Sequence, residues 1–158
     1  MAGSKSDAFE NSLLLHIFQN AAIADIGSAA GYTLPASTTA GSLYVALHTA
    51  ALTDTSTMIT SEVTVLQYNS YVRQAVARSA GGWTVSTNTV SNAAAITFPA
   101  MVSGTGVTVT YFSVGYANSS ATGTAGTILY WGDLTSSLAV SAGITPQFAI
   151  GALVITED

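Results

Sequence analysis

Val107–Tyr116, with the sequence Val-Thr-Val-Thr-Tyr-Phe-Ser-Val-Gly-Tyr, is the stretch that decides the fold. Large apolar residues alternate along it with Thr, Ser or Gly, which is the two-residue period of a β-strand. β-branched and aromatic side chains also suit the pleated, half-buried surface of a sheet. The large residues change phase between Tyr111 and Phe112. The stretch therefore predicts either a strand that is covered on both faces or a β-bulge at that point.

A return strand is expected after this one. Ala117–Gly126 is rich in Ala, Ser, Thr and Gly and predicts a turn-rich loop, whereas Thr127–Leu134 has the composition of a second strand. Two strands joined by such a loop are typical of a β-hairpin. We take this hairpin as the centre of an antiparallel β domain.

Shorter stretches of the same kind occur on both sides of the hairpin. The predicted strands are Ser42–Thr49, Tyr71–Ala77, Trp83–Val90, Ala94–Phe98, Leu138–Val140 and Gln147–Thr156. Short strands at intervals of roughly ten residues indicate a sandwich or barrel rather than an alternating α/β fold. The predicted fold class is therefore mainly β, with an antiparallel, jelly-roll-like β-sandwich and one N-terminal amphipathic helix.

That helix is expected over Ala8–Asn20. Asp7 and Glu10 have the spacing of a capping box, with a carboxylate at the N-cap and another three residues later. Apolar residues then recur at helical spacing and form one stripe, which includes Phe9, Leu13 and Ile17. The stripe must cover either the sheet of the same chain or a neighbouring subunit.

The composition excludes several classes of protein. Only 7% of the residues are charged, against about a quarter in typical soluble proteins. The only cations are Lys5, Arg73 and Arg78, so the basic patch that nucleic-acid binding requires is absent. Polar residues interrupt every apolar run, and we expect no membrane span. The absence of cysteine excludes thiol catalysis, disulfides and thiolate metal sites.

The length and the surface composition indicate how the chain is organised. The 158 residues suffice for one domain with a substantial core. We expect an N-terminal tail and helix over residues 1–20, followed by a single β-sandwich domain over residues 21–158. A surface rich in Ser and Thr but poor in charge suits a protein that packs against copies of itself or against another protein.

No set of residues predicts catalysis. His16 or His48 could pair with one of the many serines, but the chain has no Gly-x-Ser-x-Gly motif. Asp54, Glu62 and Asp133 are placed in loops or beside turns, where carboxylates are ordinarily solvated. No phosphate-binding loop and no metal-ligand spacing occurs either. We therefore expect no enzyme, no catalytic residue, no metal site and no cofactor.

Candidate interface residues come from three features. The helix stripe offers Phe9, Leu13 and Ile17; the strand region offers Arg73 and Arg78; and the tryptophans are Trp83 and Trp131. An arginine could pair with an acid across a subunit contact, but it could also be an ordinary exposed strand residue. Each tryptophan could be an interface anchor or a buried core residue.

The order of several segments resembles a known family. The segments are Glu10–Phe18 (Glu-Asn-Ser-Leu-Leu-Leu-His-Ile-Phe), Leu43–Thr49 (Leu-Tyr-Val-Ala-Leu-His-Thr), Tyr71–Val76, Ile96–Pro99, Tyr111–Gly115, Gly126–Gly132 and Phe148–Ile155. In this order they resemble a family of small tailed-bacteriophage virion proteins, which includes head decoration (cement) proteins and tail-fibre proteins. The similarity extends from Asp7 to Thr156.

The resemblance implies a non-catalytic virion component that is made in the host cytoplasm. As a capsid decoration protein, it would sit on the outer surface of the head and bind the major capsid protein and copies of itself, as a homo-oligomer such as a dimer or trimer. The alternative is a tail-fibre or receptor-binding module that recognises a bacterial surface glycan. Exposed tyrosines such as Tyr44, Tyr68 and Tyr116 would then line a sugar site.

Overall fold

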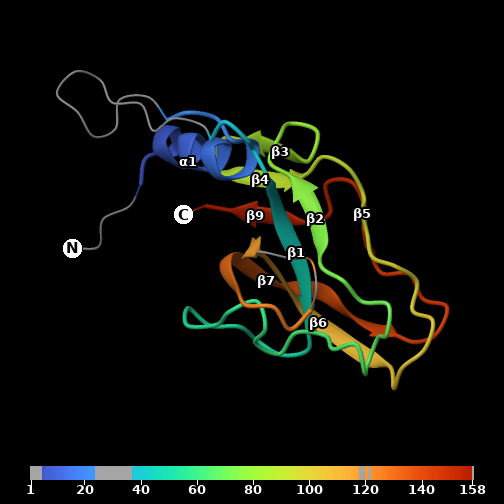
Figure 1. The fold of residues 1–158 in the computed structure, drawn as a ribbon. Coiled ribbons are helices and arrows are strands. Elements are labelled where there is room, and N and C mark those ends of the chain that lie inside the picture. Colours follow the sequence, from blue (N-terminus) through green and yellow to red (C-terminus); the bar gives the residue numbers. More distant parts are fainter. Residues whose placement is uncertain (1–4, 24–36, 118–119, 121, 158) are drawn as a thin grey trace. The chain divides into compact units, whose positions relative to one another are not determined.

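The computed structural model describes residues 5–23, 37–117, 120 and 122–157. The chain forms two compact units. Unit 1 consists of Met1–Ser42, Ala77–Ala95 and Phe148–Asp158, and unit 2 consists of Leu43–Val76 and Ile96–Gln147. Figure 1 labels the helix and the strands.

Helix α1 (Asp7–Gln19) confirms the predicted helix but begins and ends one residue earlier. Its N-cap is Ser6, so the prediction of Asp7 as the cap was wrong. The Ser6 hydroxyl oxygen accepts a hydrogen bond from the N–H of Phe9 at 3.4 Å. Asp7 lies instead in the first turn, where its carboxylate still interacts favourably with the helix dipole. Asn20, in the left-handed conformation with φ 56°, ends the helix.

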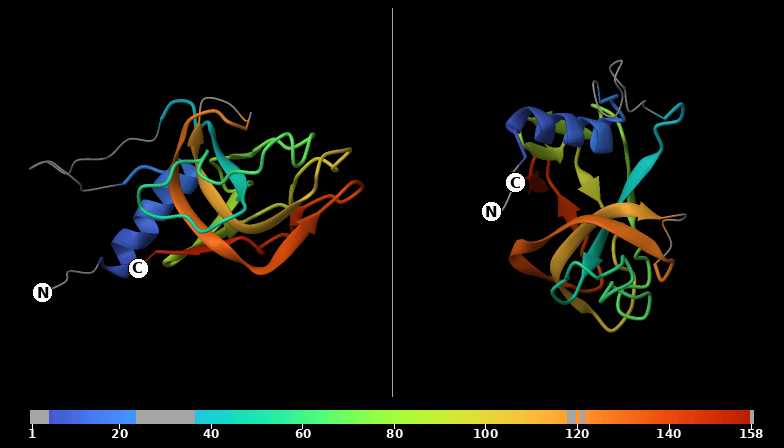
Figure 2. Two further views of the ribbon diagram at one scale, coloured as in Figure 1. Left: turned by 90° about the horizontal axis from the view of Figure 1, so that it is seen from below. Right: turned by 90° about the vertical axis from the view of Figure 1, so that its left-hand side faces the viewer.

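Unit 1 is built on a three-stranded antiparallel sheet with the order β3-β4-β9. The strands are β3 (Trp83–Ser86), β4 (Thr89–Asn92) and β9 (Val154–Thr156). Helix α1 packs against β3 and β4 (Figure 2). The ring of Phe18 meets the ring of Trp83 edge-on, with 4.8 Å between their centroids, and both residues are fully buried. The helix therefore covers a sheet of its own chain.

Two predicted strands are each divided by a turn. Trp83–Val90 contains β3, a turn at Thr87 with φ 53°, and the start of β4. The last predicted strand breaks after β8 (Gln147–Phe148) and resumes only as β9. The side chain of Asn92 holds the intervening turn, because it donates to the carbonyl of Ala149 at 2.7 Å and accepts from the N–H of Leu153 at 2.9 Å.

Unit 2 contains most of a four-stranded sheet with the order β2-β1-β6-β7. The strands are β1 (Ser42–His48), β2 (Gln74–Ala77), β6 (Val107–Ala117) and β7 (Gly126–Val140). Strand β6 pairs antiparallel with β1 and with β7, which confirms the central hairpin. Strand β7 continues to Val140 and so includes the predicted separate strand Leu138–Val140.

The phase change in β6 has the first of the two predicted causes. Phe112 and the three residues after it are all buried, so both faces of the strand are covered. The register also shifts twice, between Val109 and Tyr111 and between Val114 and Gly115. In both places the extra residues lie on β7, whose partner residues change from Leu138 to Asp133 and from Tyr130 to Ile128. The bulge expected between Tyr111 and Phe112 is therefore not found, since both residues pair with β1 in continuous register. Bulges bend and twist a strand, and Figure 2 shows the strong curvature of β7.

The fold is mainly β, as predicted. Strand β5 (Ile96–Thr97) pairs with β8 in a third, two-stranded sheet. Within the described ranges there is one helix, and the sheets have four, three and two strands. These residues do not show a closed sandwich or a jelly roll. The division into residues 1–20 and residues 21–158 stays a prediction.

Candidate binding site

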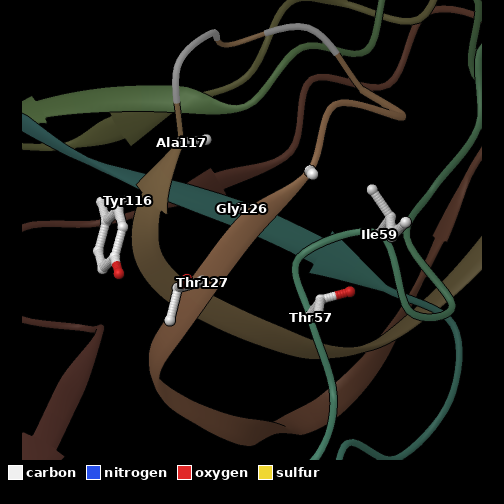
Figure 3. A pocket seen from close by; sticks show the side chains of 7 residues that line it. Thr57, Ile59, Tyr116, Ala117, Gly126 and Thr127 are labelled. Carbon is white, nitrogen blue, oxygen red and sulfur yellow. The ribbon is translucent and has the colours of Figure 1, made fainter.

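Unit 2 has a surface pocket of about 410 Å³ at the start of β7 (Figure 3). It is lined by Thr57, Ile59, Tyr116, Ala117, Ala125, Gly126 and Thr127. None of these residues is charged. The lining therefore combines apolar carbon with a few hydroxyl groups, which is the usual make-up of a small-molecule site.

Strand pairing places three of the lining side chains in a row. Tyr116 on β6 stands directly opposite Thr127 on β7, and Thr57 opposes Thr127 through an isolated antiparallel bridge. Side chains that are directly opposite in antiparallel strands project from the same face. Figure 3 shows Thr127 between the other two. Tyr116, which is 55% exposed, thus presents its ring beside two exposed threonines.

Gly126 allows the pocket walls to approach one another. A Cβ atom at this position would lie 2.9 Å from the Cβ of Ala117 and 2.9 Å from the sulfur of Met58. The N–H of Met58 donates to the carbonyl of Gly126 at 3.1 Å, which joins the two chain segments. Any side chain here would push them apart.

The loop that leads into the pocket is attached to a buried ion pair. Arg73 donates from Nε and Nη2 to the two carboxylate oxygens of Glu62, at 2.7 and 2.8 Å. Their side chains are 0% and 3% exposed. Nη2 also donates to the carbonyl of Thr124 at 2.8 Å, and Glu62 accepts from the N–H of Gly123 at 3.3 Å. The pair therefore fixes the backbone directly before Ala125.

Tyr71 extends this buried network. Its hydroxyl accepts from the N–H of Leu47 at 2.9 Å and donates to Glu62 at 3.3 Å. Burial raises the pKa of Tyr71, and the neighbouring Glu62 charge raises that pKa further. Tyr71 is therefore a neutral donor that supports the carboxylate.

His48 contacts a serine, as one pair of a Ser-His-Asp triad would. Its Nδ1–H donates to the carbonyl of Thr60 at 2.8 Å, which leaves Nε2 to accept from the Ser113 hydroxyl at 2.8 Å. Burial lowers the pKa of His48, so the neutral form is favoured. His48 and Ser113 are both fully buried and open to no substrate. The contact is structural.

The predicted apolar interface residues differ in how far they are exposed. Phe9 and Trp131 are each 38% exposed, and Leu13 and Ile17 are partly buried. Trp83 is fully buried in unit 1. A role of these residues in contacts between copies stays a prediction, and none of them lines the pocket.

The two arginines find their partners within the chain. Arg73 pairs with an acid, as the interface hypothesis required, but the acid is Glu62 of the same unit. Arg78 donates to the carbonyls of His16 and Ile17, each at 2.6 Å, and so binds the C-terminal end of α1. A cation at this end also complements the helix dipole.

Of the three tyrosines proposed for a sugar site, only Tyr116 lines the pocket. Tyr68 was predicted to be exposed, and this was wrong: it is fully buried, and its hydroxyl donates to the carbonyl of Pro99. Tyr44 is partly buried. Thr57 and Ile59 were missed, because a loop has no periodicity from which side-chain direction can be inferred.

Other kinds of site are not found in the part of the chain that the structure describes. No three His, Asp or Glu residues are grouped there so that they could hold a metal ion. No helix among these residues is long and apolar enough to cross a membrane.

The comparison with known families gives one match. Residues 4–156 match the model of the podophage GP4 fiber I protein gp80. No curated protein matches the chain. The match covers nearly all of the sequence and favours the tail-fibre alternative, whereas the predicted cement function at the capsid surface receives no support. The chain therefore belongs to the podophage GP4 fiber I protein gp80 family, and it is a non-enzymatic structural protein of the tailed-phage virion.

Proposed function

We propose that this protein is a component of the phage tail fibre and helps the particle attach to its host by binding a glycan on the bacterial surface. The family match supports the place in the fibre. The observation that supports glycan binding is the exposed ring of Tyr116 beside the hydroxyls of Thr57 and Thr127 in an uncharged pocket.

Attachment through such a pocket is favoured when the pocket keeps one shape and when each fibre carries several copies of it. Rigidity is supported by Arg73 and Glu62, which hold the loop beside the pocket through four hydrogen bonds to each other and to the loop backbone. Repetition would come from several copies in the fibre. A weak affinity of each copy then suffices, because simultaneous binding raises the overall affinity by orders of magnitude.

We also propose that copies of the chain associate with one another. The low charge of the chain supports this, because the buried centre of a protein–protein interface is poor in charged residues. Sedimentation of the purified chain tests the point. A dimer or trimer at micromolar concentration is the expected result, and a monomer throughout would contradict it. Binding to the major capsid protein stays an untested prediction.

Adsorption to host cells tests the proposed function. The purified full chain should bind cells of the phage's host and should reduce phage adsorption in proportion to its concentration. Treatment of the cells with periodate, which cleaves vicinal diols of sugars, should remove the binding. Protease treatment of the cells should leave it unchanged. Binding that survives periodate but not protease, or no binding at all, would contradict a glycan receptor.

A further inference from the structure

We propose that the pocket binds one uncharged sugar residue, with the apolar face of the sugar ring against Tyr116 and its hydroxyls toward Thr127 and Thr57. This inference rests on the proposed glycan-binding function and adds the chemical class of the ligand.

The row formed by the three side chains of Tyr116, Thr127 and Thr57 is about as long as one sugar residue. Tyr116, Thr127 and Thr57 occupy facing positions on three adjacent chain segments. Adjacent segments of a sheet lie about 4.8 Å apart, so the row spans about 10 Å. One hexose ring with its hydroxyls fills that length. The pocket volume of about 410 Å³ leaves room for the bond to the next sugar.

The lining residues match both the apolar face and the hydroxyl groups of a neutral sugar. One face of a pyranose ring presents C–H groups, which pack against an aromatic ring, and the ring of Tyr116 is exposed for such contact. Threonine hydroxyls both donate and accept hydrogen bonds, so Thr57 and Thr127 can bind sugar hydroxyls of either orientation. Ile59, which is 48% exposed, adds apolar contact.

An acidic sugar would find no counter-ion among the described residues that line the pocket. The chain has three cations: Lys5 bonds Glu157, Arg73 is buried against Glu62, and Arg78 is bound to the carbonyls at the end of α1. A carboxylate that entered the pocket would lose hydration without gaining a charged partner. The net charge of −5 would also repel it.

A titration with a matched pair of sugars tests this inference. Galactose and galacturonic acid differ only at C6, where a neutral CH₂OH replaces a carboxylate. In an NMR titration of the full chain at pH 7, galactose should shift the signals of Tyr116, Thr127 and Thr57. Galacturonate should bind at least about tenfold more weakly, which corresponds to about 1.4 kcal/mol. Equal or tighter binding of galacturonate, or shifts confined to other residues, would overturn the inference.

Two variants test the role of the aromatic ring. Tyr116→Ala should weaken galactose binding about tenfold, because it removes the surface against which the ring packs. Trp131→Ala, which removes another exposed aromatic residue of the same hairpin outside the pocket, should leave the affinity unchanged. The spectra of both variants establish that each is folded. Equal affinities of the two variants would overturn the assignment.

Cell binding then separates the two proposals. If the wild-type chain binds host cells in a periodate-sensitive way and Tyr116→Ala does so equally well, the proposed function stands and the pocket assignment fails. If the wild-type chain does not bind host cells, the proposed function fails. Loss of cell binding in Tyr116→Ala but not in Trp131→Ala supports both.

Discussion

Removing one partner of the buried Arg73–Glu62 pair should destabilise unit 2 strongly. In Glu62→Gln, Arg73 keeps its charge in a position that is 0% exposed, with the Thr124 carbonyl as its remaining strong acceptor. Breaking a buried ion pair in this way costs about 3–5 kcal/mol of unfolding free energy. Arg73→Met leaves the carboxylate with Tyr71 and a loop N–H as donors, so we expect a loss near the lower end of that range.

The double variant should cost less than the sum of the single variants. With Glu62→Leu and Arg73→Met together, no buried charge is left unpaired. What remains is the loss of the three hydrogen bonds that the pair makes to Thr124, Gly123 and the Tyr71 hydroxyl, at about 1 kcal/mol each. We therefore expect the double variant to lose about 3 kcal/mol in total, which is no more than Glu62→Gln loses alone and well below the sum of the two single variants.

Urea unfolding and amide hydrogen exchange measure these losses, with the buried amides of β1 and β6 as the probes of unit 2. Lys5→Met is the matched control, because it removes the more exposed ion pair with Glu157 at 3.2 Å and should cost less than about 1 kcal/mol. Losses below about 1 kcal/mol in both single variants, or a double variant that equals their sum, would refute the reasoning.

Three further predictions concern the core. Burial lowers the pKa of His48 below its ordinary value of 6.5, so the unfolded chain takes up a proton at a higher pH than the folded chain does. The free energy of unfolding should therefore fall by up to about 1.4 kcal/mol for each pH unit below 6.5. A melting temperature that rises from pH 7 to 5.5, or one that changes equally in His48→Gln, would contradict this. A Cβ at Gly115 would overlap a backbone carbonyl of the facing strand, so Gly115→Ala should lower the free energy of unfolding in urea by about 1–3 kcal/mol. The control Gly81→Ala should leave it unchanged, because the nearest atom to a Cβ there is 3.7 Å away. Phe18→Ala should lower the free energy of unfolding by about 3–5 kcal/mol, because the Phe18 ring packs on Trp83 beneath the helix. Phe9 is partly exposed, so Phe9→Ala should cost much less. Equal losses in the two variants would show that the helix does not belong to the core.

The hydrophobic periodicity of the sequence predicted the helix and those strands whose side chains face the core and the solvent at regular intervals. Alternation along Val107–Tyr116 identified β6, because one strand of eleven residues keeps the period long enough to be recognised. It did not reveal that Trp83–Val90 is a hairpin, since a tight turn at Thr87 leaves the alternation undisturbed. The helix was predicted to within one residue, but its cap was misassigned because Ser6 and Asp7 are both good N-caps.

The candidate site could be predicted only in part. Tyr116 was predicted to be an exposed aromatic residue and is exposed, whereas Tyr68, for which the same was predicted, is buried. The pocket depends on an isolated bridge between Thr57 and Thr127, which lie far apart in the sequence. The scarcity of cations drew attention to Arg73, but only the three-dimensional contacts identify its partner Glu62, which was assigned to a polar loop.

The position of the protein on the virion tests the central claim most directly. A cryo-EM reconstruction of the intact phage, labelled with an antibody fragment against this chain, should place the label on the tail fibres, with a copy number far below that of the major capsid protein. Label spread over the head surface at a copy number comparable to that of the capsid protein would contradict the account.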